Sequence, residues 1–264
     1  MRSFLRNTYL GLIGPFRKPS PGVHIINSHF VTPYIPSEDD MIMMDDYLSF
    51  LSQYCKLITI QEATLMISSG KIDQNQCMVA FTFDDGFEEC HTVIAPTLEK
   101  YGCNAAFFIN SNYIESDESY QNNFNRRINT YTKKPMTWDQ VTDLHNRGHV
   151  IGAHTLDHLN LADLSDLEIE NQLVLNKNIL EKKLNYQCDY FAWTYGQFQH
   201  FPDRALKITQ KYHKFIFSGT DYKNYYSYEG QVINRRHIEA FWPKSHVRFF
   251  LSQKKRYFIR VDNS

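Results

Sequence analysis

The sequence predicts an α/β fold in which helices cover a parallel sheet, arranged either as a barrel or as a doubly wound sheet. Short apolar runs alternate with longer amphipathic segments, which is the order that parallel strands and their connecting helices require. The chain has 264 residues, of which 42% are hydrophobic and 15% aromatic, so it can bury the core of one barrel-sized domain. We therefore expect a single domain over residues 1–264.

Local signals predict each element. Apolar runs indicate the strands, and amphipathic stretches that begin at Ser or Thr or end at Gly indicate the helices. The expected strands cover residues 22–31, 56–60, 77–83, 104–110, 149–154, 190–195, 214–219 and 256–261. The expected helices cover residues 37–55, 61–69, 91–102, 137–148 and 165–184, with N-caps at Ser37, Thr137 and Ser165 and ends at Gly70, Gly102 and Gly148. Two polar segments, 111–135 and 219–231, are expected to be substrate lids or surface loops.

The overall composition argues against several partners and compartments. The formal net charge is −1, so no global field attracts nucleic acid. No apolar run is long enough for a transmembrane helix, and the first residues lack the apolar core and small-residue cleavage site of a signal peptide. The five cysteines are odd in number and show no CxxC spacing, which indicates reduced thiols. We expect a cytoplasmic protein.

Two adjacent carboxylates end the third expected strand. The apolar run 77–83 stops at Asp84-Asp85-Gly86, and carboxylates this close raise each other's pKa unless positive charge lies nearby. A turn with a helix cap is the commonest role for such a pair. In a parallel α/β fold, however, chemistry concentrates at the C-terminal ends of the strands. There we also expect Asn110, His154, Tyr195 and His29.

Two histidines match the carboxylates. His154 and His158 follow the expected strand 149–154, and a tight turn would aim both imidazoles inward. With one Asp they make a three-ligand set that leaves positions open on a divalent metal. His145 and His149 have the same spacing, but Gly148 separates them, so we expect that pair to be structural. The two motifs at two strand ends together favour a metal site.

These motifs resemble a known family. "FTFDDG" and "HTLDH" are similar to the first two motifs of the polysaccharide deacetylases, the NodB-homology group or carbohydrate esterase family 4. The run from Met136 to Ser165 and "FAWTYG" (191–196) agree with the family's order and spacing, so the similarity spans roughly residues 56–218. The resemblance implies a distorted (β/α)7-type barrel with parallel strands.

The resemblance also implies a role for each motif residue. Asp85, His154 and His158 would bind the metal, most often zinc, and Asp84 would be the general base that deprotonates water. The backbone N–H of Tyr195 would help to hold the oxyanion, and Thr155 would support the second motif through hydrogen bonds. Trp193 and Tyr195 would form an apolar wall for the acyl methyl group or, equally, belong to the core.

The sequence departs from the family pattern at two points. Many members carry an arginine in the third motif that pairs with the base, and Ala192 stands at that position here, so Arg235 or Arg236 would have to supply the charge. The C-terminal histidine that serves as general acid is also displaced. Neither His237 nor His246 lies in a Leu-x-His pattern; we favour His237 as the acid, with a surface or packing histidine as the alternative. His29 would point into the pocket or stack in the barrel.

The expected function is metal-dependent removal of an N-acetyl or similar acyl group from a carbohydrate. Without a leader peptide, a nucleotide-linked or lipid-linked precursor of lipopolysaccharide or another surface polysaccharide is the favoured substrate. Basic and aromatic segments at both ends would lie on the inner face of the membrane or pack against the barrel. Two alternatives stay open: a glycan-binding barrel without turnover, and a deformylase or other C–N hydrolase. The sequence sets no expectation for the oligomeric state.

Overall fold

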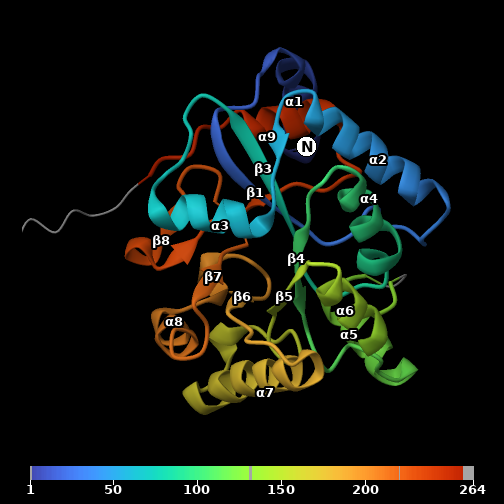
Figure 1. Ribbon diagram of the computed structural model, residues 1–264, viewed down its shortest axis with the longest axis vertical. Helices are drawn as coiled ribbons and strands as arrows, with labels where there is room; N and C mark the ends of the chain where they lie inside the picture. Colours follow the sequence, from blue (N-terminus) through green and yellow to red (C-terminus); the bar gives the residue numbers. More distant parts are fainter. Residues whose placement is uncertain (1, 131–132, 220, 258–264) are drawn as a thin grey trace, which may run out of the picture.

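The computed structural model describes residues 2–130, 133–219 and 221–257, with side chains from residue 5 onward. Its described strands form one curled sheet in the order β10-β1-β3-β4-β5-β6-β7-β9-β8, with β2 paired to β3 (Figure 1). All neighbouring strands are parallel except β8 and β9. This order follows the chain without the reversal of a doubly wound sheet, and no described pairing joins β10 to β8. The predicted distorted barrel is confirmed, and it is open on one side.

The elements alternate as expected. The strands are β1 (Gly22–Ser28), β2 (Lys56–Leu57), β3 (Cys77–Phe83), β4 (Ala105–Ile109), β5 (Val150–Ala153), β6 (Tyr190–Ala192), β7 (Phe215–Phe217), β8 (Tyr226–Ser227), β9 (Val232–Ile233) and β10 (Arg236–His237). The α-helices are α1 (Arg2–Ile13), α2 (Asp39–Ser52), α3 (Ile60–Ser69), α4 (Ala95–Lys100), α5 (Glu118–Ile128), α6 (Trp138–Asn146), α7 (Asp166–Leu184), α8 (Asp203–Thr209) and α9 (Lys244–Leu251).

The two faces of the sheet bury different side chains because successive residues of a strand point to opposite sides. Outward-facing residues such as Ile26, Phe81 and Phe107 belong to the large apolar cluster beneath the helices. The inward-facing residues of the same strands, among them Ile25, Ala80 and Phe108, form a second apolar cluster, and α3 covers it with side chains such as Ile67. Toward the C-terminal ends the inner face becomes polar, with Asn27, Thr82, Asp84 and Asn110, all of them buried.

Several predicted boundaries are confirmed and others are wrong. Thr137 and Ser165 cap α6 and α7 through complete capping boxes. Ser37 is not a cap: α2 begins at Asp39, its N-cap is Glu38, and the Ser37 hydroxyl bonds the Asp40 carboxylate at 3.3 Å instead. In the last expected strand, 256–261, Arg256 forms only an isolated bridge to Asn224, and residues 258–261 lie outside the described residues.

The polar segment 111–135 is not an irregular loop, because it contains α5. Asp117 caps this helix by accepting a hydrogen bond from the N–H of Tyr120 at 2.8 Å, and Asn129 ends it in the left-handed region with a φ of 61°. Within α5 only Phe124 and Asn125 are buried. Tyr120, Phe124 and Ile128 recur four residues apart on one face of the helix, but every other residue is polar, so the segment resembles a polar loop and was not predicted as a helix.

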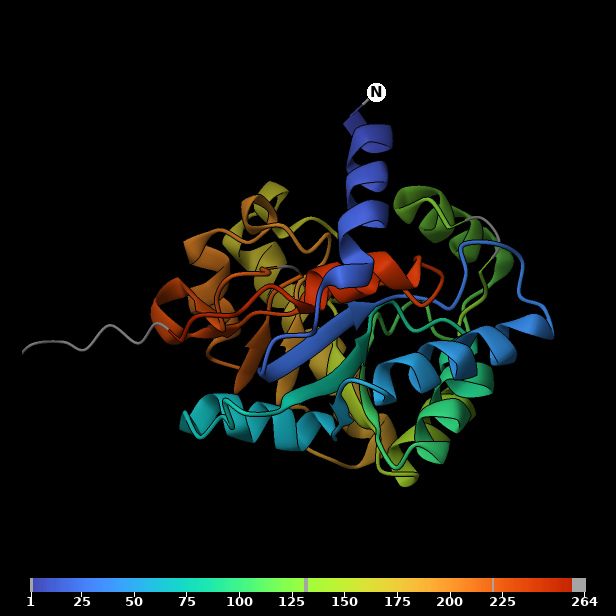
Figure 2. The same ribbon diagram turned by 90° about the horizontal axis from the view of Figure 1, so that it is seen from above.

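The N-terminal helix projects outward from the barrel (Figure 2). It packs against α9, and its exposed apolar side chains include Leu5, Tyr9 and Leu12. None of the helices in the described part of the chain is long and apolar enough to cross a membrane. All five cysteines are buried and free, as expected for thiols that serve as small core residues.

We predict that Ser165→Ala lowers the free energy of unfolding by about 1 kcal/mol, because it removes the oxygen that caps the N–H of Glu168 at the start of α7. Urea denaturation followed by circular dichroism measures this change. Ser69→Ala, near the end of α3, is the control, since Ser69 caps no helix N-terminus. An equal loss in both variants would contradict the capping role.

Candidate active site

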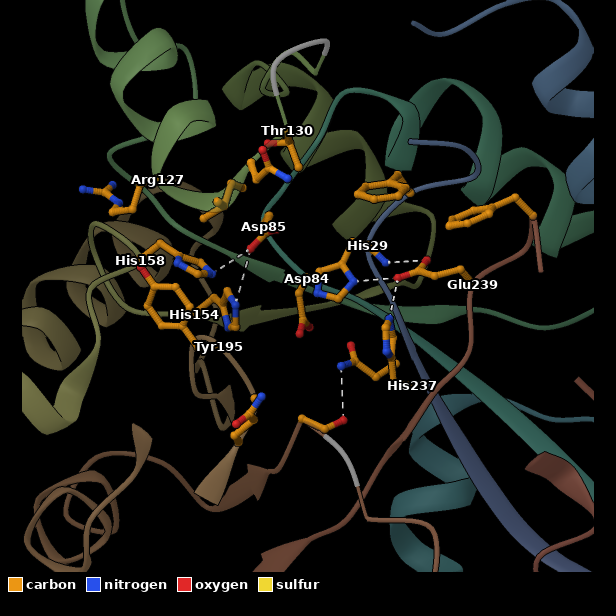
Figure 3. Close-up of a pocket in the computed structure, with 18 of the residues that line it drawn as sticks. His29, Asp84, Asp85, Arg127, Thr130, His154, His158, Tyr195, His237 and Glu239 are labelled. Carbon is orange, nitrogen blue, oxygen red and sulfur yellow. Dashed lines mark hydrogen bonds and ion pairs between the residues drawn. The ribbon is translucent and has the colours of Figure 1, made fainter. Parts of the chain in front are cut away.

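A cavity of about 880 Å³ opens at the C-terminal ends of the strands. Figure 3 shows two groups of polar side chains on opposite sides of Asp84: Asp85 with His154 and His158, and His29 with His237 and Glu239. Aromatic residues line the same cavity, including Phe30, Tyr195, Phe198, Phe241 and Trp242. The predicted location at the strand ends is therefore where these residues meet.

Asp84 and Asp85 both face this cavity although they are adjacent in the chain. Neighbouring residues of an extended strand would point in opposite directions, but Asp85 has a φ of 78° and turns its carboxylate back toward the inner face. Both residues are only 3% exposed. Two buried carboxylates need separate partners, because neither can rely on water for its solvation.

Asp85 meets both predicted histidines. Its Oδ1 lies 3.5 Å from Nε2 of His154 and 3.3 Å from Nε2 of His158, and the donor atoms of all three residues lie within 4.8 Å of one another. Ligands at about 2.1 Å around a tetrahedral ion are separated by about 3.4 Å, so this spacing fits a small divalent cation. Asp85 Oδ1 has no hydrogen-bond partner among the described residues, as expected of an oxygen reserved for a cation.

The imidazoles are oriented by groups behind them. Nδ1 of His154 donates to the carbonyl oxygen of Ala192 at 2.7 Å, which leaves the lone pair of Nε2 directed at Asp85. Burial lowers the pKa of His154 to about 4, against the attraction of Asp84, so the ring is neutral and able to bind a metal at pH 7. Thr155 accepts the N–H of His158 at 3.1 Å, which is the supporting role predicted for it.

Backbone strain is concentrated at the same residues. Thr155, His158 and Tyr195 have φ values of 64°, 55° and 61°, in the left-handed region that residues with a Cβ rarely adopt. Asp85 adds a fourth such residue. Unfavourable conformations of this kind persist where surrounding contacts impose them and cluster at functional sites. Asn110 supplies one such contact, donating from Nδ2 to the carbonyl oxygen of Thr155 at 3.0 Å.

Arg235 provides the positive charge for Asp84. Its guanidinium group donates two parallel hydrogen bonds, from Nη1 to Oδ1 at 2.7 Å and from Nη2 to Oδ2 at 2.8 Å. Burial alone would raise the pKa of Asp84, but the charge of Arg235, aided by His154, lowers it. Arg236 points the other way and donates to the carbonyl oxygen of Phe250 at 2.6 Å. Of the two arginines offered by the sequence, the structure brings Arg235 to the carboxylate.

A second cluster lies across the cavity. One oxygen of Glu239 bonds Nδ1 of His29 at 2.8 Å and Nε2 of His237 at 2.9 Å. Burial tends to lower the pKa of His29, but the hydrogen bond and charge of Glu239, with the charges of Asp85 and Asp84, raise it to about 9. The two histidines in turn lower the pKa of Glu239 to about 2 despite its burial. These donor atoms also lie within 4.8 Å of one another, so a cation could in principle compete for them.

The other predicted residues divide between cavity and core. Tyr195 lines the cavity, with its ring 4.8 Å from that of His158. Trp193 does not line it: the side chain is fully buried and stacks on Phe201 at 4.3 Å, so its predicted substrate contact is wrong and its alternative core role is correct. His246 lies on α9 and is not among the lining residues.

The segment 111–135 forms one wall of the cavity. Arg127, Asn129 and Thr130, at the end of α5 and just after it, line the opening. Below them Tyr113 stacks on Phe124 at 3.9 Å, which holds the segment as a folded unit against the barrel. The described residues of the expected lid, 111–130 and 133–135, thus belong to a folded part of the structure that includes α5.

Sequence reasoning missed Glu239 and Asn27. Glu239 follows His237 by two residues, and that spacing places both side chains on one face of an extended segment, which was the available signal. Asn27 lies two residues before His29 on the inner face of β1, and its buried amide lines the cavity floor. Neither residue belongs to a motif, so only the barrel brings them to the site.

The chain belongs to the polysaccharide deacetylase family, as predicted. The family model for polysaccharide deacetylases matches residues 71–213, which is more than half of the chain. A peptidoglycan-N-acetylglucosamine deacetylase of Bacillus cereus is 31% identical over 124 residues, covering 47% of this chain and 38% of the relative. A chitooligosaccharide deacetylase of Azorhizobium caulinodans is 27% identical over 133 residues, covering 48% and 54%. The chain spans about half the length of its curated relatives, or less.

Solved structures support the fold independently. The structure of IcaB from Ammonifex degensii superimposes with a TM-score of 0.70 at 19% identity, covering 89% of this chain and 99% of that one. A deacetylase of Streptococcus pyogenes, PplD, in complex with acetate gives a TM-score of 0.67 at 17% identity, with 88% and 99% covered. Dependence on a divalent metal is general in this family, and the group of Asp85, His154 and His158 fits one.

We predict that Asp85→Asn weakens the binding of a divalent cation by at least about 100-fold, because it removes an anionic ligand. Isothermal titration with Zn²⁺ and metal analysis after dialysis measure the change. The adjacent Asp84→Asn is the matched control and should retain the cation, since Asp84 bonds Arg235 instead. Loss of the cation in Asp84→Asn with retention in Asp85→Asn would contradict the assignment.

Proposed function

We propose that the protein hydrolyses the N-acetyl group of an amino sugar to acetate and a free amine, with a divalent metal, zinc, held by Asp85, His154 and His158. The observation that carries this proposal is the separation of the two carboxylates, one toward the histidines and one toward Arg235. A cation in the first group supplies Lewis-acid activation of water and of the acyl carbonyl. Family membership supplies the substrate class, an N-acetylated saccharide.

Asp84 is the general base of the proposal. The charge of Arg235 keeps its pKa low, so the carboxylate is ionised at neutral pH and ready to accept a proton from the attacking water. The bidentate geometry also fixes the plane of the carboxylate. Tyr195 lines the cavity beside His158, and its backbone N–H is the proposed donor to the oxyanion.

His29 is better placed than His237 to protonate the leaving amine. Its Nδ1 is held by Glu239, and in Figure 3 its other ring nitrogen points toward Asp84. A pKa of about 9 keeps His29 protonated at pH 7, as a general acid requires. His237 bonds Glu239 through Nε2 and thereby fixes the carboxylate that holds His29. This assignment replaces the earlier preference for His237.

Within this substrate class we propose the substrate that the sequence predicts, a nucleotide-linked or lipid-linked precursor of lipopolysaccharide or another surface polysaccharide. The reaction would take place at the inner face of the membrane. Aromatic side chains on the cavity rim, such as Phe198 and Phe241, suit the apolar faces of sugar rings. Leu5, Tyr9 and Leu12 share one exposed face of α1, which supports peripheral contact with lipid.

Acetate release tests this function. The purified protein, loaded with Zn²⁺, is incubated with N-acetylated chitooligosaccharides, peptidoglycan, a nucleotide-linked N-acetylhexosamine and a lipid-linked one, each with and without EDTA. The proposed deacetylase activity predicts EDTA-sensitive release of acetate from at least one of these substrates. The proposed substrate predicts faster release from a nucleotide-linked or lipid-linked sugar than from the polymers. A metal-loaded, folded protein that releases acetate from none of them would contradict it.

Glu239 is expected to set the alkaline limb of the pH profile. A raised pKa means that His29 is protonated at neutral pH and loses its proton as the pH rises, so kcat/KM falls there. Glu239→Gln removes the charge that raises this pKa and should move the limb to lower pH by about one unit or more. Glu118→Gln, at an exposed position of α5, should leave this limb unchanged.

The two histidine variants test which residue is the acid. His29→Gln should lower kcat/KM by about 10²-fold or more, and His237→Gln should lower it less. The reverse order would restore His237 as the acid.

Arg235 is expected to set the acidic limb. Because Arg235 lowers the pKa of Asp84, Arg235→Met should raise it and shift the acidic limb of kcat/KM to higher pH by about 1–3 units. Arg236→Met removes an adjacent buried arginine that does not touch Asp84 and serves as the control. Thermal melting of both variants accounts for lost stability. An acidic limb that moves equally in both would show that Arg235 does not tune the base.

A further inference from the structure

Asn27 places an unpaired acceptor at the floor of the active-site cavity. The residue is only 4% exposed, yet its Oδ1 has no hydrogen-bond partner among the described residues. Such an oxygen is unfavourable unless a ligand or water supplies a donor.

The orientation of the Asn27 amide is fixed. Nδ2 donates to the carbonyl oxygen of Gly219 at 3.2 Å, so rotation of the amide by 180° would bring two acceptor oxygens together. Gly219 is itself held: its N–H donates to the carbonyl of Gly196 at 3.1 Å, and a Cβ on Gly219 would lie 2.1 Å from Cα of Gly196. The oxygen of Asn27 is therefore the end of the amide left for the cavity.

Strand register places Asn27 close to the reacting groups. On β1 it lies opposite Thr82 of β3 and opposite His237 of β10, and laterally paired residues point to the same face of a sheet. His29 follows two residues later on that face, and Asp84 follows Thr82 by two residues. Asn27 thus lies one side-chain layer beneath the proposed acid and base.

We propose that Oδ1 of Asn27 accepts a hydrogen bond from the amide N–H of the N-acyl substrate, so that Asn27 makes the site selective for amides over esters. This inference rests on the proposed deacetylation. His29 would approach the amide nitrogen of the substrate from one side, so the hydrogen on that nitrogen points in another direction. Asn27 offers a neutral acceptor for this hydrogen on the same inner face. An O-acetyl ester has no such hydrogen and would set its own oxygen against Oδ1, leaving the acceptor unpaired.

The test compares amide and ester hydrolysis in one set of variants. kcat/KM is measured for an N-acetylated chitooligosaccharide, or whichever N-acetyl substrate the wild type uses best, and for 4-methylumbelliferyl acetate. Asn27→Leu keeps the approximate size and removes the acceptor, and it should lose about 10- to 100-fold on the amide and less than about 3-fold on the ester. Asn27→Gln keeps the amide with its donor and acceptor and should preserve more of the amide preference than Asn27→Leu. Asn178→Leu, on the exposed face of α7, makes the same change elsewhere and should alter neither rate.

The possible outcomes separate the two claims. If the wild type cleaves the amide and Asn27→Leu loses both activities in parallel, or neither, with its bound metal and melting temperature retained, the inference fails and the deacetylase function stands. If Asn27→Leu does not fold, the ratio of amide to ester rates in Asn27→Gln decides, and a parallel fall of both rates relative to the wild type would overturn the inference. A wild type that cleaves the ester but no N-acetyl substrate overturns both claims.

Discussion

Two adjacent buried carboxylates cannot both be charged without separate neutralisation, and the arrangement of the whole site answers that constraint. The left-handed turn at Asp85 lets both side chains face the cavity, where each finds its own partner. Arg235 binds Asp84 through two hydrogen bonds, and the imidazoles of His154 and His158 surround Asp85 at a spacing that suits a cation. In the proposed mechanism the same division gives each carboxylate its role: Asp84, paired with a fixed guanidinium, would be the base, and Asp85, beside two imidazoles, would be a metal ligand.

In the cluster of His29, His237 and Glu239 a buried carboxylate also lies between two histidines, but here it favours the protonated form of one of them. Glu239 is buried between two imidazoles, and its negative charge raises the pKa of His29. The protonated imidazole of His29 is then not available to bind a metal. His154, which is neutral, lies near Asp85, and His29, which is protonated, lies near Glu239 on the opposite side of the cavity. The barrel makes this possible by bringing β1, β3 and the segment after β9 together at one edge.

The order of the strands and helices and the residues of the two main motifs were predictable from the sequence, because both depend on residues that are close together in the chain. The strand and helix order follows from hydrophobic alternation, and Asp84, Asp85, His154 and His158 lie in short motifs next to strand ends. Asp84 and Arg235 are 151 residues apart in the sequence, so no local pattern separates Arg235 from Arg236. In the fold, Arg235 points inward to Asp84 and Arg236 points toward Phe250. Glu239 and Asn27 belong to no motif, and the place of Trp193 depends on its contact with Phe201. The few apolar residues of α5 are outnumbered by polar ones, so its sequence resembles a loop.

Anomalous diffraction from crystals grown with Zn²⁺ tests the central claim most directly. Data collected on either side of the zinc absorption edge locate the ion without reference to any mechanism. The account predicts a single strong peak coordinated by Asp85, His154 and His158, with Asp84 still bonded to Arg235. A peak between His29, His237 and Glu239 instead, or no ordered ion within reach of Asp85, would contradict it.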